Sequence, residues 1–224
     1  MPRSKLTTDP RQFAAEDDRS PRRGLTAQLW AAIAMTLMLC LITGFIYPGV
    51  VTGLAQVLFN RQANGSLVTV NGRVVGSALI GQSFTRPEYF HPRPSGAGNG
   101  YDATASAGTN KGPTDRKLAD TLIAQAVNAA VANDGAVKGK VPSDMATASG
   151  SGLDPHISPA NAHLQVARVA KARGVDSTAV RALLDRHVEG RQFGFFGEPR
   201  VNVLLLNIAL DSAFAAPKAP PATK

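Results

Sequence analysis

The sequence contains one cysteine, Cys40, so no intramolecular disulfide can form in any compartment. Basic residues exceed acidic ones in residues 52–224, by 18 Lys and Arg to 12 Asp and Glu, but they are scattered singly. Basic runs with interleaved aromatic residues, which are typical of nucleic-acid interfaces, are missing. A nucleic-acid partner is therefore not expected.

Charged residues and histidine are also missing from the stretch 24–60. Its central part, residues 29–51, reads LWAAIAMTLMLCLITGFIYPGVV and is almost continuously apolar. A helix needs about 20 such residues to cross the roughly 30 Å hydrocarbon core of a bilayer. Trp30 and Tyr47 lie near the two ends, where aromatic rings favour the headgroup region. We predict a transmembrane helix at residues 25–51.

A cleavable signal peptide is the alternative interpretation, because Gly53 and Ala55 form a small-x-small pair that resembles a cleavage site. The apolar part of a signal peptide is only about 7–15 residues long, and this one is longer. Retention of the helix is therefore favoured, and Thr52–Phe59 is expected to continue it past the membrane surface.

Basic residues flank the apolar segment unequally. Four arginines lie close on its amino side, and only Arg61 lies as close on its carboxyl side. The four are Arg11, Arg19, Arg22 and Arg23. The positive-inside rule then predicts a single-pass membrane protein with a cytoplasmic amino terminus and an extracytoplasmic carboxyl-terminal domain. In a bacterial setting this means the inner membrane, with the domain in the periplasm.

Composition divides the chain into four parts. They are a disordered cytoplasmic tail (1–24), the transmembrane helix (25–51), an extracytoplasmic domain (52–212) and a disordered Pro- and Ala-rich tail (213–224). The third part is predicted to be an α+β domain with a β-hairpin, several helices and long Gly- and Pro-rich loops.

The hairpin is predicted by SLVTVNGRVVGSALI, two β-branched runs separated by Asn71-Gly72, a pair that favours a type I′ turn. Thr85–Pro113 is rich in proline, glycine and small polar residues without periodicity, as expected of a functional or binding loop. Helical spacing of apolar residues predicts an amphipathic helix over Thr114–Ala132. The last apolar run, Val201–Leu210, is ambiguous and is assigned to a helix because alternation fails at its centre.

Two further helices are predicted between these segments. Ser158 is the expected cap of the first, Pro159 takes its first position and Gly174 ends it. Either Asp176 or Ser177 caps the second.

The stretch TASGSGLDPHISPANAHLQVARVA, residues 147–170, combines features of an active site, a metal site and a structural element. A structural interpretation explains most of it, since Gly150 and Gly152 permit a tight turn with positive φ and Asp154-Pro155 starts another. The small polar groups that remain suit a rigid docking surface. The candidate docking residues are Ser149, Gly150, Ser151, Gly152, Asp154, His156 and Ser158.

Templates for catalysis and metal binding do not fit the chain. SGSG (149–152) lacks the spacing of a nucleophile elbow, and neither GAGNG (96–100) nor GTNKGPT (108–114) has the spacing of a nucleotide-binding loop. A closed metal site requires about four ligands. The chain offers three near one another in sequence, Asp154, His156 and His163. No catalytic residue, metal ligand or cofactor-binding residue is therefore assigned.

Gly49 and Gly53 form a small-xxx-small pattern in the outer half of the apolar segment. Such pairs let helix backbones approach closely, so both glycines are candidates for packing against a partner helix. The alternative is that glycines beside Pro48 only loosen the helix.

Four longer stretches carry a family pattern. They are TGFIYPGVVTGLAQVLFNRQANGSL, VGSALIGQSFTRPEYFHPRPS, TASGSGLDPHISPANAHLQVARVAKARG and GFFGEPRVNVLLLNIALD. They resemble the C subunit of the bacterial Kdp potassium-transporting ATPase, and the resemblance covers residues 43–211. Asn60 stands where the family pattern has proline, and residues 101–113 vary a loop pattern while keeping its chemistry.

The resemblance implies an accessory, non-catalytic subunit of a high-affinity, ATP-driven potassium uptake complex. Its implied partners are a channel-like potassium-translocating subunit, a P-type ATPase catalytic subunit and a small single-span subunit. The family is described as a catalytic chaperone that raises the ATP affinity of the ATPase subunit, so ATP is implied only through that partner. The alternative function is a stand-alone, membrane-tethered extracytoplasmic enzyme or ligand-binding sensor.

Overall fold

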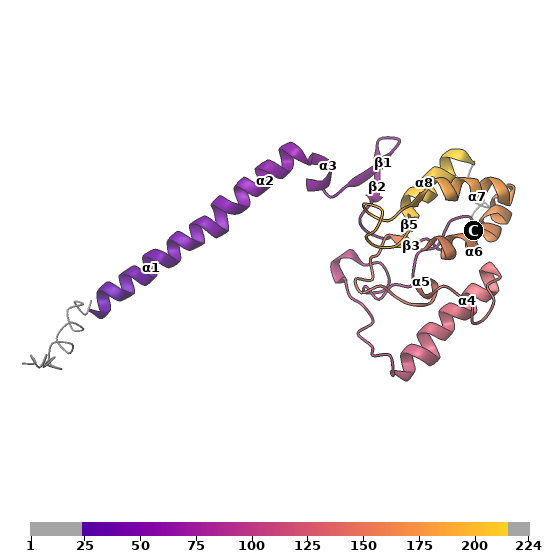
Figure 1. The fold of residues 1–224 in the computed structure, drawn as a ribbon, viewed down its shortest axis with the longest axis horizontal. Helices are drawn as coiled ribbons and strands as arrows, with labels where there is room; N and C mark the ends of the chain where they lie inside the picture. Colours follow the sequence, from indigo (N-terminus) through magenta and orange to yellow (C-terminus); the bar gives the residue numbers. More distant parts are fainter. Residues whose placement is uncertain (1–23, 215–224) are drawn as a thin grey trace, which may run out of the picture. The chain divides into compact units, whose positions relative to one another are not determined.

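A computed structural model describes residues 24–214, so the tails predicted at either end lie almost entirely outside the described residues. The chain divides after Ala63 into two compact units, and each is described by itself. The first is helical, and the second combines helices with short antiparallel strands (Figure 1). This mixture of helix and sheet agrees with the predicted α+β class.

A long apolar helix makes up most of the first unit. It consists of α1 (Leu25–Leu41), a π-helical stretch (Ile42–Ile46) and α2 (Tyr47–Leu58), followed by the short α3 (Asn60–Ala63). The segment Leu25–Leu58 is helical over 34 residues, and an 18-residue stretch within it has a mean hydropathy of 2.2. At 1.5 Å per residue it is roughly 50 Å long, which exceeds the roughly 30 Å of a bilayer core. No other helix in the described part of the chain is long and apolar enough to cross a membrane.

Pro48 explains why the apolar helix is irregular near its middle. Proline has no N–H to donate, and its ring collides with the carbonyl four residues earlier in a regular α-helix. The wider π-helical turn at Ile42–Ile46 lies just before Pro48 and relieves this conflict. Thr36 and Thr43 donate their hydroxyls to carbonyls four residues back, at 2.8 and 2.7 Å, so both hydroxyls are paired within the helix.

The predicted hairpin lies near the start of the second unit. Its strands, β1 (Leu67–Val70) and β2 (Arg73–Ser77), pair antiparallel across a two-residue turn. Asn71 and Gly72 have φ angles of 50° and 76°, and a type I′ turn requires positive φ at both positions. The prediction of the turn is confirmed.

The sequence patterns do not predict the second sheet. Its strands are β3 (His156–Ile157), β4 (Val188–Glu189) and β5 (Arg200–Asn202), in the order β3-β5-β4, and both pairs are antiparallel. Strands of two or three residues are too short to show alternation between apolar and polar residues. They pair only because segments distant in sequence meet in the fold.

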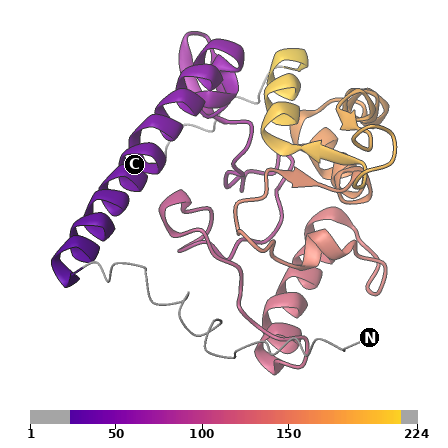
Figure 2. The ribbon, with the colours of Figure 1, turned by 60° about the vertical axis from the view of Figure 1, so that its left-hand side comes forward.

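The helix predicted over Val201–Leu210 is wrong at its start. Its first two residues belong to β5, which leads directly into α8 (Val203–Ala213), as Figure 2 shows. The Asn202 side chain accepts a hydrogen bond from the Leu205 amide at 3.1 Å and so caps the helix. Strand pairing before this cap fixes the boundary, and neither partner strand can be recognised from local sequence.

The helix predicted over Thr114–Ala132 begins and ends later than expected. A π-helical stretch, Leu118–Ile123, is continued by α4 (Ala124–Asp134). The Asp115 carboxylate accepts a hydrogen bond from the amide three residues later, at 3.0 Å, and the helix begins only after this contact. Gly135, with φ of 67°, ends it.

The caps predicted for the next two helices are confirmed. Ser158 precedes α6 (Pro159–Arg173), and its hydroxyl accepts a hydrogen bond from the amide three residues later at 3.1 Å. Gly174 ends α6 with φ of 64°. Of the two alternatives for α7 (Ser177–Arg186), Asp176 is the cap, because its carboxylate accepts from the amide two residues later at 3.3 Å.

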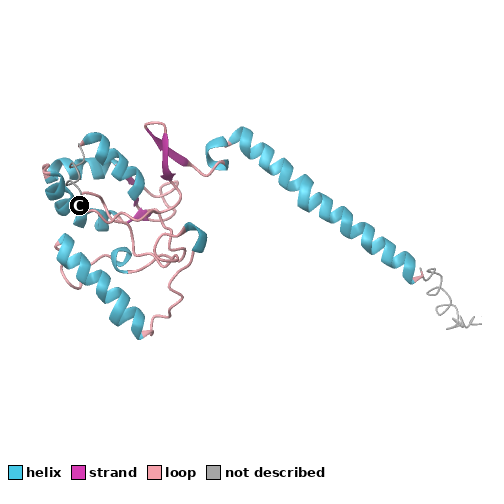
Figure 3. Cartoon of the chain, turned by 180° about the vertical axis from the view of Figure 1, so that it is seen from behind, coloured by secondary structure: helices cyan, strands magenta, loops and turns pink. Residues whose placement is uncertain are grey.

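Loops form a large part of the second unit (Figure 3). Residues 81–102 contain neither helix nor strand. A 3₁₀ turn (Ala103–Ala105) and the one-turn helix α5 (Ser143–Ala146) lie in or beside the loops that follow.

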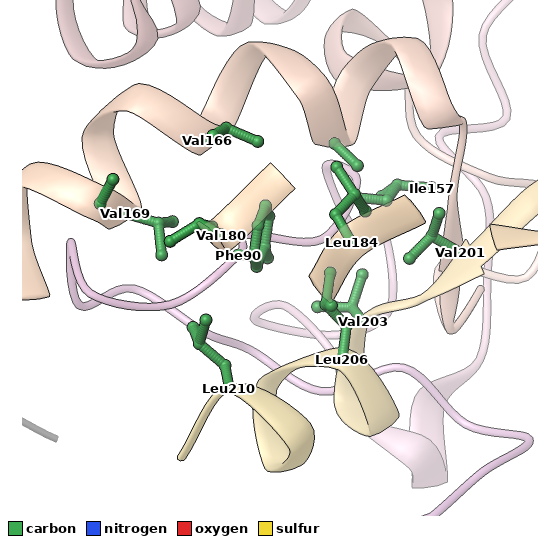
Figure 4. Packing of buried hydrophobic residues seen from close by; sticks show 12 residues of the cluster. Phe90, Ile157, Val166, Val169, Val180, Leu184, Val201, Val203, Leu206 and Leu210 are labelled. Atoms are coloured by element: carbon green, nitrogen blue, oxygen red, sulfur yellow. The ribbon is translucent and has the colours of Figure 1, made fainter. Parts of the chain in front are cut away.

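The core of the second unit lies where α6, α7, α8 and β5 meet. Figure 4 shows their apolar side chains gathered around Phe90, which comes from the irregular segment 81–102 and is 0% exposed. The other buried members are Ile157, Ala162, Val166, Val169, Ala170, Val180, Leu184, Val201, Val203, Leu206 and Leu210. Burying one phenylalanine stabilises a fold by about 1.5–3 kcal/mol, so Phe90 ties the irregular segment to the helices.

Candidate functional site

The candidate docking residues lie in the loop that precedes β3 and at the start of α6. Ser149 is half-buried, Gly150 and Ser151 are exposed, and Gly152 is buried. Gly152 has φ of 68°, as predicted, and a Cβ there would lie 2.6 Å from backbone atoms of residues 97 and 107. Both the backbone conformation and the close approach therefore require glycine at position 152.

The positive φ predicted for Gly150 is wrong. Gly150 lies outside the left-handed region, and a Cβ added to it would meet nothing within 4 Å. The close contact at this point belongs to Gly108, whose added Cβ would lie 2.9 Å from the Gly150 carbonyl oxygen. Where the two loops meet at Gly150, packing therefore requires glycine at position 108 of the opposite loop and not at position 150.

Side-chain hydrogen bonds tie residues 149–153, here called the docking loop, to the segment 95–108. The Ser95 hydroxyl donates to the Gly152 carbonyl at 2.6 Å, and the Ser106 hydroxyl donates to the Ser151 carbonyl at 3.0 Å. Within the docking loop, the Ser151 hydroxyl accepts from the Leu153 amide at 3.1 Å. These bonds hold the docking loop against the segment 95–108.

Asp154 is held by its neighbours on both sides. Arg93 donates from Nη1 to Asp154 Oδ2 at 2.9 Å, and the His156 amide donates to Oδ1 at 2.9 Å. Partial burial acts to raise the pKa of Asp154, but hydrogen bonds from His156 and Arg93 outweigh it and keep that pKa below its usual value. Asp154 is therefore an ionised structural anchor at neutral pH.

Tyr101 fixes the backbone of Arg93. Its hydroxyl donates to the Arg93 carbonyl at 2.5 Å. Burial, reinforced by the negative charge of Asp154, raises the pKa of Tyr101, so the hydroxyl remains a donor. The Arg93 side chain is held through Nη1, while its Nε is buried without a partner among the described residues.

Ser158 joins α5 to α6 in addition to capping α6. Its amide and hydroxyl donate to Asp144 of α5 at 2.7 and 2.9 Å. Asn161 donates to the same carboxylate from Nδ2 at 2.9 Å. The role of Ser158 in this arrangement is structural.

Two carboxamide side chains hold the irregular segment beside Phe90, an arrangement that sequence reasoning missed. Gln165 of α6 accepts from the His91 amide at 2.6 Å and donates to the His91 carbonyl at 3.0 Å. Asn207 of α8 does the same with the Phe90 amide and carbonyl, at 2.9 and 3.0 Å. Gln165 and Asn207, here called the carboxamide clamp, thus pair with the main chain much as a neighbouring strand would.

Two arginines of α6 bind further backbone carbonyls of the same irregular segment. Arg168 donates to two of its carbonyls, at 2.6 and 2.9 Å, and pairs with Asp134 of α4 at 2.7 Å. Arg173 donates to the Glu88 carbonyl at 2.8 Å and pairs with Asp211 of α8 at 2.6 Å. Four side chains therefore replace the sheet partners that this extended backbone lacks.

A signal for this arrangement is present in the sequence. Asn161, Gln165 and Arg168 recur at helical spacing, and the first two are fully buried on the side of α6 that faces the core. Buried polar groups are almost always hydrogen-bonded, so a polar row on an apolar face predicts backbone partners. The identity of those partners cannot be read from spacing.

A cavity of about 340 Å³ lies beside the clamped segment. His91 and Arg93 line it together with Asn133 and Asp134 of α4. Burial, assisted by the positive charge of Arg168, lowers the pKa of His91 and keeps its ring neutral at pH 7.

The residues weighed as metal ligands do not converge. His156 lies beside Asp154, whereas His163 Nε2 lies 3.3 Å from Asp185 Oδ1 on α7. Within residues 24–214, no three His, Cys, Asp or Glu side chains are grouped as ligands of one ion. The geometry around Asp154 is that of a packed loop junction.

A family model described as "K+-transporting ATPase, c chain" matches residues 29–212. The chain belongs to this KdpC family. The potassium-transporting ATPase KdpC subunit of Gemmatimonas aurantiaca is 63% identical over 185 residues, which cover 82% of this chain and 92% of the relative. The subunits of that name from Koribacter versatilis and Rhodospirillum rubrum are 53% and 56% identical, over 84% and 82% of this chain and 96% and 94% of theirs.

The KdpC match includes both the apolar helix and the domain, and it confirms the family resemblance inferred from the sequence. As a KdpC chain, the protein is a subunit of a potassium-transporting ATPase. Its candidate helix-packing residues, Gly49 and Gly53, both lie in α2, and a Cβ at either would meet nothing within 4 Å. Both glycines are exposed within the described part of the first unit, as helix-packing positions must be.

Proposed function

We propose that this chain is an accessory, non-catalytic subunit that stabilises the assembled potassium-transporting ATPase. The observation that carries the proposal is the KdpC match over residues 29–212, which takes in the apolar helix and the domain together. The helix would anchor the chain in the inner membrane by a single pass, and the domain would dock on other subunits through rigid surfaces such as the docking loop. The hydrogen bonds from Ser95 and Ser106 support that role for the docking loop.

The partners of the chain are inferred from the family. They are a channel-like potassium-translocating subunit, a P-type ATPase catalytic subunit and a small single-span subunit. The excess of arginines before the apolar helix supports a cytoplasmic amino terminus and an extracytoplasmic domain.

An effect on the ATP affinity of the ATPase subunit would be indirect in this arrangement. ATP is a cytoplasmic ligand, and the proposed orientation places the domain on the opposite side of the membrane. The chain also has no sequence with the spacing of a phosphate-binding loop. Any rise in ATP affinity would therefore be transmitted through assembly and the apolar helix.

Co-purification tests the proposal directly. A tagged copy of the full chain, co-expressed with the other subunits and extracted in detergent, is expected to recover them in fixed stoichiometry. Omitting the chain is expected to reduce potassium-stimulated ATP hydrolysis and to raise the KM for ATP. A partnerless monomer with its own hydrolase or ligand-binding activity would instead support the stand-alone alternative.

A reporter fusion tests the orientation. Asp211 pairs with Arg173, so a fusion directly after Asp211 could disturb the fold. Alkaline phosphatase is therefore fused after Lys224, beyond the last described residue. This fusion is expected to be active, because the enzyme requires the extracytoplasmic compartment, and a fusion after Gly24 is expected to be inactive. The reverse pattern would contradict the proposed orientation.

A further inference from the structure

The connection between β4 and β5 exposes three phenylalanines. Phe193, Phe195 and Phe196 are 79%, 64% and 58% exposed. Phenylalanine is among the residues most often buried, and exposed apolar groups of this kind mark interaction sites. The rings of Phe195 and Phe196 lie together, with centroids 4.2 Å apart. Residues 189–200 are called the aromatic finger below.

The backbone of the aromatic finger is held in a defined shape. Gln192 and Phe196 exchange both of their main-chain hydrogen bonds, each at 2.9 Å, which closes the tip as a small hairpin. At the tip, Phe193 has φ of 54° and Gly194 has φ of 83°. Positive φ is unfavourable for a bulky aromatic residue. The Phe193 ring is exposed and is not part of the hydrophobic core.

Two ion pairs brace the base of the aromatic finger. Arg191 donates to both carboxylate oxygens of Glu198, at 2.9 and 2.7 Å, and Arg200 donates to Glu189 at 2.9 Å. The four charges of the finger are therefore paired with one another and sum to zero. Segments that bind anionic lipid surfaces present unpaired Lys and Arg beside their apolar residues, and this finger does not fit that pattern.

The exposed area of the finger suits an anchor within a larger interface. From their exposure, the three rings offer roughly 400 Å² of apolar surface, taking about 200 Å² for each full side chain. Two fingers meeting each other would bury roughly 800 Å² in total, which is the size of a crystal contact and below the roughly 1,000 Å² of a stable dimer. A rigid aromatic group inserted into a pocket is instead the usual form of an interface hot spot.

We propose that the aromatic finger anchors this chain to another protein subunit of the transporter, by inserting its phenylalanines into an apolar pocket on that subunit. The inference rests on the proposed assembly of the chain with partner subunits, and it assigns part of that assembly to residues 193–196. The pocket is expected to be lined by aliphatic or aromatic side chains and to be uncharged, since the finger brings no unpaired charge.

A photo-crosslinker identifies the occupant. p-Benzoylphenylalanine is placed at Phe195 in the full complex, and the matched control carries it at Val137, an isolated apolar residue that is 62% exposed. Irradiation is expected to link position 195 to a different subunit, as identified by mass spectrometry of the product. Crosslinking to lipid, to a second copy of this chain, or at no more than the Val137 level would overturn the proposal.

Substitution measures the strength of the anchor. Phe195→Ser combined with Phe196→Ser is expected to reduce recovery of the other subunits at least tenfold, because hot-spot truncations weaken interfaces by that order. Val137→Ser is the matched control and is expected to leave recovery unchanged. The variant's thermal unfolding, measured on the purified chain, is expected to match the wild type because the rings contribute little to the core.

The outcomes separate the two proposals. If the wild-type chain recovers no other subunit, the proposed assembly fails. If the wild type recovers its partners and the Phe195→Ser, Phe196→Ser variant recovers them equally well, the assembly stands and the aromatic finger is not its anchor. If the double variant loses both recovery and thermal stability, the Phe195→Leu variant, which keeps an apolar side chain, decides the matter. Recovery of partners at the wild-type level by Phe195→Leu is expected if the finger is the anchor. Loss of recovery in Phe195→Leu as well would overturn the proposal.

Discussion

Gly152 and Gly150 stand two positions apart, yet only one of them must be glycine. Gly152 combines φ of 68° with a space in which a Cβ would lie 2.6 Å from two backbone atoms. Gly150 has neither constraint. The difference is set by the neighbouring loop, because residues 97 and 107 close around Gly152 and leave Gly150 open.

Replacing Gly152 with alanine is expected to destabilise the domain by roughly 2 kcal/mol or more, because the new Cβ adds a backbone clash to an unfavourable φ. In a domain of this size the loss corresponds to a fall in Tm of roughly 4–8 °C. Gly150→Ala, the matched control, is expected to leave Tm nearly unchanged. Equal shifts for the two variants in thermal unfolding would contradict the prediction.

His91 gives the stability a dependence on pH. Burial and the charge of Arg168 lower its pKa in the folded state, against weaker opposing effects of the Arg86 carbonyl and Asp134. In the unfolded chain the pKa returns to about 6.5, so below that pH the unfolded state binds a proton that the folded state does not. Stability is therefore expected to fall as pH falls through about 6.5, by up to about 1.4 kcal/mol per pH unit.

The His91→Gln variant is expected to show a shallower fall, because it removes the group that takes up the proton. Urea unfolding of both chains at several values between pH 8 and pH 5 measures the two slopes. Parallel slopes would show that His91 does not carry the dependence.

At the scale of elements, α6 (Pro159–Arg173) organises the domain. Its start is joined to α5 through Ser158, its middle holds the irregular segment through Gln165, and its end reaches α8 through Arg173. The helix thus carries buried polar contacts beside the apolar side chains that it contributes to the core. Changes to its buried polar residues are expected to loosen loops rather than the helix itself.

Ser158→Ala is expected to cost about 1–2 kcal/mol of domain stability. The substitution removes the cap of α6, which alone is worth about 1 kcal/mol, and leaves Asp144 without one of its donors. Ser177→Ala is the matched control, because Asp176 caps α7 in its place. Chemical denaturation of the two variants compares them, and a loss in Ser177→Ala as large as in Ser158→Ala would refute the assignment of the cap.

At the scale of the whole molecule, the KdpC family match and the apolar helix make this chain a membrane-associated subunit whose surfaces must meet other proteins. We propose three surfaces for that purpose. The glycine pair on α2 offers close backbone approach, the docking loop offers rigid polar groups, and the aromatic finger offers apolar rings. Each has a different chemistry, so each can be tested by its own substitutions.

Replacing Gly49 and Gly53 with leucine is expected to reduce recovery of the complex several-fold, because large side chains keep a partner helix at a distance. Ala34→Leu, a similar increase in size in the other half of the apolar helix, is the control and is expected to have little effect. Co-purification from detergent extracts measures both. Unchanged recovery of the glycine variant would favour the alternative that these glycines, beside Pro48, only loosen the helix.

The sequence by itself determined the features that local chemistry controls. The apolar helix follows from bilayer thickness and the absence of charge in residues 24–60, and the hairpin turn follows from the ease with which Asn71-Gly72 adopts positive φ. The Ser158 cap follows from the unpaired amides at the start of every helix, whereas the sequence left Asp176 and Ser177 as alternatives for α7 and the structure selected Asp176. Each of these depends on neighbours within a few residues.

Only the tertiary structure decided the rest, because the groups involved are far apart in the chain. β3 and β5 pair His156 with Asn202, and the carboxamide clamp joins Gln165 to His91 and Asn207 to Phe90. Two-residue strands and single buried amides carry no periodic signal, and they are stable only when folding supplies their partners and removes water. For the same reason Gly152, and not Gly150, became the glycine that the docking loop requires.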